Sequence, residues 1–149
     1  MNTIENASVS LMKWIVIILT LIVSGCGPQQ VEKGSPEDIS IKFFSSIYIE
    51  RDIKKSTQFV TSDIKQLLNH YHIASAVQRN VIGLSMTDVE FEIEDIDIDF
   101  FRRLTKDVTV RVKFRGLKGG SPWVDDRTLR LKRRDDSWVI VELLPERIR

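Results

Sequence analysis

The stretch Val89-Glu90-Phe91-Glu92-Ile93-Glu94 marks the point where the sequence changes from a helical to a strand pattern. Apolar and acidic residues alternate strictly in it, as in a β-strand with one buried face. The alternation then changes phase, because Ile96, Ile98 and Phe100 form the next apolar set. Since side chains alternate along a strand, the change of phase requires an extra residue. We therefore predict a β-bulge or a sharp bend near Glu94-Asp95, which would curl the sheet.

Three more strands follow with the same alternation. Residues 108–114 place valine or phenylalanine at every second position, which predicts a second strand. A Gly-rich loop over residues 116–122 then leads to a third strand over residues 128–132. The hairpin turn Arg134-Asp135-Asp136-Ser137 leads to a fourth strand, residues 138–143.

Three helices are expected before these strands. Ser35-Pro36-Glu37-Asp38 provides a capping serine, a proline at the first helical position and two acids at the positive end of the dipole, so a helix begins here and ends near Tyr48. Asp52 can cap a short second helix. Thr61 or Ser62 can cap a third, which should run to about Asn80. Its expected inner face consists of Ile64, Leu67, Leu68, Tyr71, Ala74 and Ser75.

This order of elements predicts an α+β fold, in which three N-terminal helices pack on a curled four-stranded antiparallel sheet.

The N-terminal segment has the layout of a secretory signal peptide. Lys13 precedes an apolar run over residues 14–23, which has half of the ~20 residues needed to span a bilayer. Its end, Val23-Ser24-Gly25-Cys26, closely resembles the bacterial lipobox, in which the cysteine becomes the lipidated first residue. The resemblance implies that Cys26 carries diacylglycerol and an amide-linked acyl chain such as palmitate. An ordinary signal peptide or an uncleaved anchor with an incidental cysteine is the alternative.

The sequence thus divides into a signal peptide (1–25), a flexible tether (26–34) and one domain (35–149). The chain has 22 basic and 21 acidic residues, and the signal peptide contains one of each, so the mature chain is balanced at 21 and 20. A balanced chain offers no electrostatic basis for binding nucleic acid. Because Cys26 is the only cysteine, the domain forms no internal disulfide. The residue after it is Gly27 rather than aspartate, which in lipoproteins implies an outer-membrane location facing the periplasm if the host has two membranes.

Residues 35–145 resemble the nuclear transport factor two-like superfamily, a cystatin-like cone in which a bent sheet wraps around a long helix. The resemblance rests on the capped first helix with its Phe43-Phe44 pair, the helical segment 52–59, the meander of strands and the closing hairpin 132–140. Small bacterial lipoproteins with this domain commonly end in such a charged turn followed by tryptophan. The chain lacks an evident strand pair between the second and third helices, which argues against a deep closed pocket.

Two sets of residues invite a catalytic or metal-binding interpretation. His70 and His72 are the only histidines, but residues two apart on a helix point about 200° apart, so no shared metal ion is expected. Enzymes on the cone fold, such as ketosteroid isomerases, use an aspartate base with a tyrosine donor. Tyr48 and Tyr71 fall on inner helical faces and would supply phenols, although core tyrosines are the simpler interpretation. No catalytic residue and no cofactor are assigned.

Three residues are candidates for contacts at the surface. Trp123 lies in the predicted Gly-rich loop, where it is either a contact anchor or a lid folded onto the core. Arg133 and Arg134, beside the last turn, are candidates for contacts with anionic headgroups or a partner protein. The remaining basic residues of the strands should form cross-strand ion pairs with Glu90, Glu92 and Glu94.

We therefore expect a membrane-anchored envelope lipoprotein that acts as a non-enzymatic binding or accessory module, using a shallow groove near Trp123 for an envelope protein or a small apolar ligand. The alternatives are an enzyme that converts a small substrate in the interior of the cone and a structural subunit of an envelope assembly that pairs through its outer sheet face. The sequence does not indicate an oligomeric state.

Overall fold

The computed structural model describes residues 34–96 and 106–144. Predictions about Cys26 and the rest of residues 1–33, and about Ile98, Phe100 and residues 145–149, lie outside this part of the chain. Within it, no helix is long and apolar enough to cross a membrane. The elements are α2 (Pro36–Tyr48), α3 (Ile53–Ser56), α4 (Ser62–Tyr71), α5 (Ala74–Val77), the π-helical turn η1 (Gln78–Ile82), β1 (Thr87–Ile96), β2 (Asp107–Lys118), β3 (Ser121–Arg134) and β4 (Ser137–Leu144).

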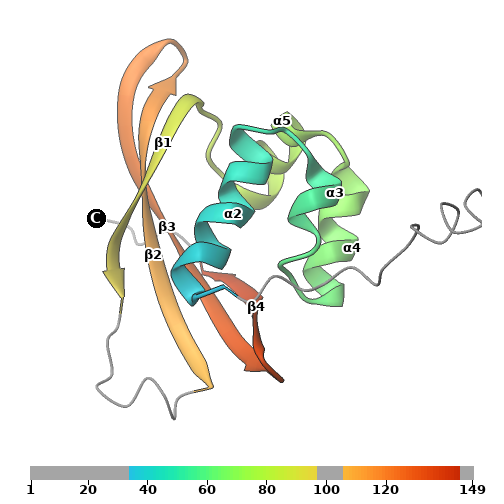
Figure 1. Cartoon of the computed structure of the whole chain (residues 1–149). Helices are drawn as coiled ribbons and strands as arrows, with labels where there is room; N and C mark the ends of the chain where they lie inside the picture. Colours follow the sequence, from blue (N-terminus) through green and yellow to red (C-terminus); the bar gives the residue numbers. More distant parts are fainter. Residues whose placement is uncertain (1–33, 97–105, 145–149) are drawn as a thin grey trace, which may run out of the picture. The chain divides into compact units, whose positions relative to one another are not determined.

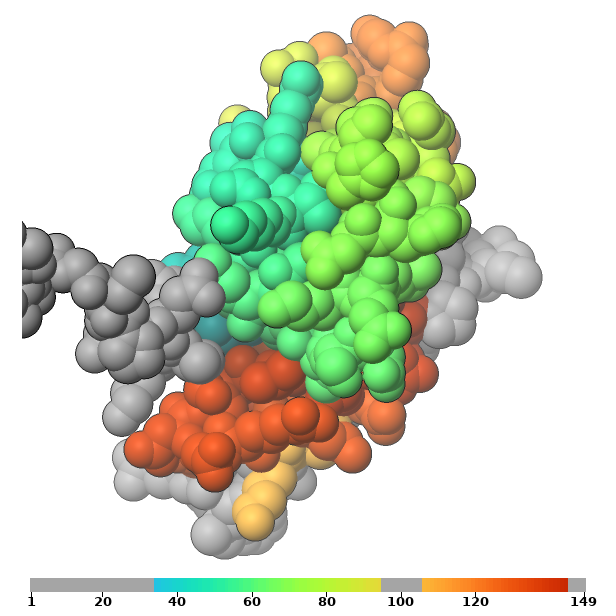
Figure 2. All heavy atoms as spheres, turned by 90° about the vertical axis from the view of Figure 1, so that its right-hand side faces the viewer, coloured from blue at the N-terminus to red at the C-terminus, as the bar shows by residue number. Residues whose placement is uncertain are grey.

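The helices lie on one face of a twisted four-stranded sheet (Figure 1). The strands form an antiparallel meander in the order β1-β2-β3-β4. Viewed from the helical side, β4 emerges beneath the helices and the hairpin between β2 and β3 rises beyond them (Figure 2). The predicted α+β fold class is confirmed, with further helical segments in addition to the three expected.

The first two helices begin where the sequence predicts. The Ser35 side chain accepts a hydrogen bond from the Asp38 N–H at 3.2 Å, and the Asp38 carboxylate accepts one from the Ser35 N–H at 3.3 Å. This capping box fixes the start of α2. The Asp52 carboxylate accepts from the Lys55 N–H at 3.0 Å and starts α3 in the same way.

The prediction of one continuous third helix is wrong. Helix α4 ends at Tyr71, His72 adopts a left-handed conformation (φ 38°), and the chain turns before α5 begins. The physical reason is burial: Leu68 and Val77 are both fully buried, but nine residues make about two and a half turns, so a straight helix would place them on opposite sides. The break also leaves Leu67 and Ser75 exposed, contrary to their expected place on the inner face.

The bulge predicted near Glu94-Asp95 is confirmed by a shift in the register of β1 against β2 between Ile93 and Asp95. A second shift, between Thr87 and Glu90, depends on a glycine of β2. A Cβ atom at Gly116 would lie 2.7 Å from the Thr87 carbonyl oxygen, which is closer than real Cβ contacts allow. Only glycine therefore fits this close approach of the two strands.

The Gly-rich loop predicted over residues 116–122 is instead a two-residue turn. Strand β2 continues to Lys118, and β3 already begins at Ser121. Gly119 and Gly120 both have positive φ, 60° and 82°, as the tight turns that match strand twist require. The paired strands consequently extend to the turn itself, and Trp123 lies in β3.

The helix-facing side of the sheet is filled by aromatic side chains. Phe114 of β2 is at the centre, with ring centroids 4.8 Å from Phe44, 5.0 Å from Phe91 and 5.3 Å from Tyr48. Phe44 and Phe114 are fully buried. The aromatic side chains thus fill the space between α2 and the sheet.

The outer face of the sheet carries cross-strand ion pairs, two of them with the acids of β1 that the sequence predicts as partners. The carboxylates of Glu92 and Glu94 on β1 lie 3.2 Å from Arg115 and 3.1 Å from Lys113 on β2. Arg130 of β3 pairs with Glu142 of β4 at 2.9 Å. These pairs give the outer face alternating charge.

Candidate functional site

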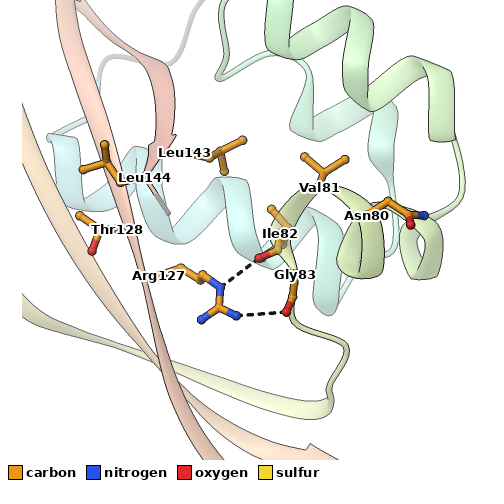
Figure 3. A pocket seen from close by; sticks show the side chains of 8 residues that line it. All are labelled: Asn80, Val81, Ile82, Gly83, Arg127, Thr128, Leu143 and Leu144. Carbon is orange, nitrogen blue, oxygen red and sulfur yellow. Dashed lines mark hydrogen bonds between the residues drawn. The ribbon is translucent and has the colours of Figure 1, made fainter. Parts of the chain in front are cut away.

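A buried polar cluster joins β3 to the segment between η1 and β1. Gly83 has φ 71° and ends the helical part of the chain, which leaves backbone carbonyls without helical partners. The Arg127 guanidinium donates to two of them, from Nε to the Ile82 oxygen at 3.0 Å and from Nη2 to the Gly83 oxygen at 3.2 Å (Figure 3). The Tyr48 hydroxyl donates to the next, that of Leu84. We call Tyr48, Arg127 and residues 82–84 the carbonyl clamp.

Asp125 supplies the counter-charge of the clamp. Its carboxylate lies 2.9 Å from Arg127 Nη1, and the two side chains are only 14% and 7% exposed. It also accepts hydrogen bonds from Trp123 Nε1 at 3.2 Å and from the Asp126 N–H at 2.9 Å. Burial alone would raise the pKa of Asp125, but these hydrogen bonds and the Arg127 charge outweigh it and hold the pKa below its usual value. The Asp125 carboxylate is therefore ionised at neutral pH.

Tyr48 is the phenol nearest to this pair. Burial raises its pKa well above the usual value, against the opposing influence of Arg127, so the hydroxyl stays protonated. It donates its proton to the Leu84 carbonyl. The interactions observed for Tyr48 and Asp125 are those of a structural network.

A pocket of about 250 Å³ opens beside the clamp, between η1 and the strands β3 and β4 (Figure 3). Val81 and Leu143 face each other across it. Asn80 adds a polar group at its rim, although its side chain already donates to the Ala76 carbonyl at 2.9 Å. The lining consists of Asn80, Val81, Ile82, Gly83, Arg127, Thr128, Leu143 and Leu144. This set contains no carboxylate, histidine or cysteine.

The structure separates the residues proposed from the sequence. Tyr48 belongs to the clamp, whereas the ring of the half-buried Tyr71 packs against His70 at 5.0 Å. Arg133 and Arg134 are exposed at the end of β3, 10 and 11 residues from Trp123. They are therefore parts of different surfaces, and no single groove contains them.

Trp123 lies in β3 rather than on the predicted loop, and its exposure rules out a lid folded onto the core, whereas its role as a contact anchor stays a prediction. It lies in β3, is 45% exposed, and has the Lys118 amino group 4.6 Å from the centre of its ring. Its hydrogen bond to Asp125 links it to the carbonyl clamp.

Sequence reasoning missed Arg127 and Asp125, although the signal was present. In the sequence, Leu129 and Leu131 alternate with Thr128, Arg130 and Lys132, which marks the two leucines as inward-facing. Counting back in steps of two places Arg127, Asp125 and Trp123 on the same side of the strand. A charged residue at an inward position of a strand needs a buried partner.

Within residues 34–96 and 106–144, no cluster of histidine, cysteine or acidic side chains is arranged to hold a metal ion. His70 and His72 are both exposed, and the His72 ring contacts the His70 carbonyl oxygen at 3.2 Å.

No family model matches the chain, and no curated protein sequence matches it. The chain is structurally similar to the solution structure of a SEC-C motif-containing protein from Rhodopseudomonas palustris, with a TM-score of 0.56 at 13% identity over 76% of this chain and 80% of that one. An NTF-2-like protein of unknown function from Shewanella oneidensis MR-1 matches with a TM-score of 0.45 at 16% identity, over 71% of this chain and 94% of that one. At this identity the first likeness shows a shared fold.

Proposed function

We propose that the protein is a lipid-anchored lipoprotein of the bacterial envelope, and that its α+β domain acts as a non-enzymatic binding or accessory module with a nuclear transport factor two-like fold. The lipobox-like sequence Val23-Ser24-Gly25-Cys26 supports the anchor. Several acyl chains at ~0.8 kcal/mol per buried CH₂ hold a protein on a membrane essentially permanently. Gly27 favours the periplasmic face of an outer membrane where the host has one.

The observation that carries the non-enzymatic part of the proposal is the filled interior. An active site requires reactive groups that converge on an accessible cavity. The aromatic packing around Phe114 fills the concave side of the sheet, and the nearby Tyr48, Asp125 and Arg127 hold the backbone and one another. These polar groups therefore serve stability rather than chemistry.

An enzyme acting on a small substrate is the second candidate, and the pocket beside the clamp is the feature that favours it. Its volume of about 250 Å³ lies just below the ~300–1,000 Å³ of typical ligand sites. However, its lining offers Asn80, Thr128 and an ion-paired Arg127 as polar groups, none of which is a general base at neutral pH. A structural subunit that pairs through the outer sheet face is disfavoured by the ion pairs on that face.

Lipidation can be tested with the wild-type chain and Cys26→Ser expressed in a bacterial host. The wild type should remain in the membrane fraction after an alkaline wash, and its mass should correspond to a chain that starts at residue 26 and carries thioether-linked diacylglycerol and an amide-linked acyl chain. Cys26→Ser should keep its signal peptide and incorporate no labelled palmitate. Ser24→Ala, which keeps a small residue before the cysteine, is the matched control and should be processed normally. A wild-type chain that starts at residue 26 with a bare thiol and washes off the membrane would contradict the proposal.

A further inference from the structure

The hairpin tip, residues 115–124, is an apolar surface that the helices leave uncovered. Trp123 and Val124 are 45% and 52% exposed, and Pro122 is exposed as well. Because side chains alternate along β3, Trp123 lies on the helix-facing side of the sheet, while Pro122 and Val124 lie on the outer side. The tip is therefore apolar on both of its faces.

The tip is also stiff. The ladder between β2 and β3 continues up to the pair Lys118 and Ser121, next to the turn, and the hairpin rises beyond the helical layer (Figures 1 and 2). Two contacts hold the Trp123 ring, the hydrogen bond to Asp125 at 3.2 Å and the Lys118 amino group at 4.6 Å from the ring centre. A ring that is already ordered loses little conformational entropy on binding.

The outermost part of the tip is positively charged. Arg115 lies opposite Glu90 of β1 and pairs with Glu92 at 3.2 Å, whereas residues 117–124 contain Lys118 as their one charged residue. The acids that follow are engaged, since Asp125 pairs with Arg127 at 2.9 Å and Asp126 with Arg111 at 3.8 Å. Tryptophan favours the interface of a bilayer, and lysine beside it is attracted to anionic headgroups.

We infer that the hairpin tip docks into the headgroup region of an anionic bilayer and gives the domain a second contact with the membrane, in addition to the lipid at Cys26. A lipid interface surrounds a narrow hairpin and covers Trp123 on one face and Val124 on the other. The inference rests on the proposed function because the anchor brings the membrane within reach.

The dimensions permit both contacts at once. Gly34 precedes α2, and the N-terminal end of α2 lies toward the end of the sheet opposite the tip (Figure 1). Helix α2 has 13 residues, about 20 Å, and the tip extends about 13 Å past Phe114, which packs against Tyr48 at the end of α2. The tether of residues 26–34 reaches about 28 Å. The lengths of α2 and of the tip together exceed the reach of the tether. With the tip at the membrane surface, the domain must therefore lie tilted, so that Gly34 stays within reach of the anchor at Cys26.

The test measures the depth of Trp123 in the membrane. The membrane-extracted protein is reconstituted into vesicles of phosphatidylethanolamine and phosphatidylglycerol with brominated acyl chains, which quench nearby tryptophan. The variant Trp14→Phe/Trp138→Phe keeps only Trp123, and the matched variant Trp14→Phe/Trp123→Phe keeps only Trp138, which is half-buried. We expect at least about twofold quenching of Trp123 and little of Trp138, as the depth of interfacial tryptophans implies.

Two further variants separate insertion from an indirect effect. Val124→Asp should abolish most of the quenching of Trp123, whereas Ile73→Asp, at a site of similar exposure (57%) on the helical layer, should leave it unchanged. Equal fluorescence of Trp123 in brominated and ordinary vesicles would overturn the inference and leave the tip to a protein partner, and so would quenching that Val124→Asp does not reduce. The mass of the same protein reports lipidation separately, so failure of the anchor and failure of the tip are distinguishable.

Discussion

The two halves of β3 show how one strand serves two purposes. In the part of β3 from Arg127 onward, which we call its second half, the inward side chains Arg127, Leu129 and Leu131 are buried beneath the helical layer. In its first half, Trp123 is on the same side of the sheet but remains 45% exposed. The alternation along the strand is identical in both halves, so it determines only the direction of a side chain. The helices determine whether that direction leads into a core or to a contact surface.

The largest expected effect on stability is that of Arg127→Met in the buried half. The substitution leaves the carbonyls of Ile82 and Gly83 without their donor and the Asp125 carboxylate without its partner. Loss of one member of a buried ion pair costs about 3–5 kcal/mol. Urea unfolding followed by circular dichroism measures this loss.

The matched control is Arg115→Met at the hairpin tip. Arg115 pairs with Glu92 at 3.2 Å, but both side chains are more than half exposed, so the cost should stay below about 1 kcal/mol. Equal losses for the two arginines would mean that the carbonyl clamp stabilises the domain no more than an exposed ion pair does.

The second-largest loss of stability is expected for Gly116→Ala, at the close approach of β1 and β2. Gly116→Ala places a Cβ 2.7 Å from the Thr87 oxygen and 2.9 Å from the Asp88 oxygen, and the strands must separate to accommodate it. We expect a loss of about 1–3 kcal/mol, as for overpacked sites. Gly34→Ala, whose Cβ would meet side-chain atoms at 3.3 Å or more, is the control. An unchanged urea midpoint for Gly116→Ala would show that β1 and β2 are held together only loosely at this point.

These sites also indicate what the sequence could predict. The bulge after Ile93, the capping box of α2 and the Asp52 cap of α3 depend on neighbours in the sequence, so local pattern was sufficient to place them. The break at His72 was not predictable locally, because it arises from the requirement that Leu68 and Val77 face the same core. Up to His72, the spacing of apolar residues is the same for a continuous helix as for an interrupted one.

The candidate site was harder to predict for the same reason. Arg127 is buried because its donors reach the carbonyls of Ile82 and Gly83, about 45 residues earlier in the chain. Sequence alternation gives the side on which Arg127 lies, but it does not reveal this long-range partner. The exposure of Trp123 likewise depends on where the helical layer ends, which the sequence of β3 does not encode.

Tyr48→Phe is expected to have a smaller effect than the substitutions at Arg127 and Gly116. It removes the donor to the buried Leu84 carbonyl, at a cost of about 1–2 kcal/mol. Because the folded state raises the pKa of Tyr48 above the value of about 10 in unfolded chains, its contribution is complete below pH 10 and decreases at higher pH. The difference between wild type and variant, measured by urea unfolding, should therefore narrow above pH 10. Tyr71→Phe, at a half-buried position, should cost less than about 0.5 kcal/mol.

The smallest effect tests whether the two halves of β3 are coupled. Trp123→Phe removes a hydrogen bond that helps to lower the pKa of Asp125, at a cost of about 0.5 kcal/mol at pH 7. A carboxylate with a lowered folded pKa stabilises the protein above the unfolded value of about 3.9, and this contribution is lost as the pH falls through the folded pKa. The difference between wild type and Trp123→Phe should therefore shrink below about pH 4 in urea titrations. Val124→Ala, on the other side of the strand, should show no such dependence. If the difference between wild type and Trp123→Phe persisted unchanged at pH 3, the exposed Trp123 ring would be energetically independent of the buried ion pair. A membrane contact at the tip would then leave the stability of the carbonyl clamp unchanged.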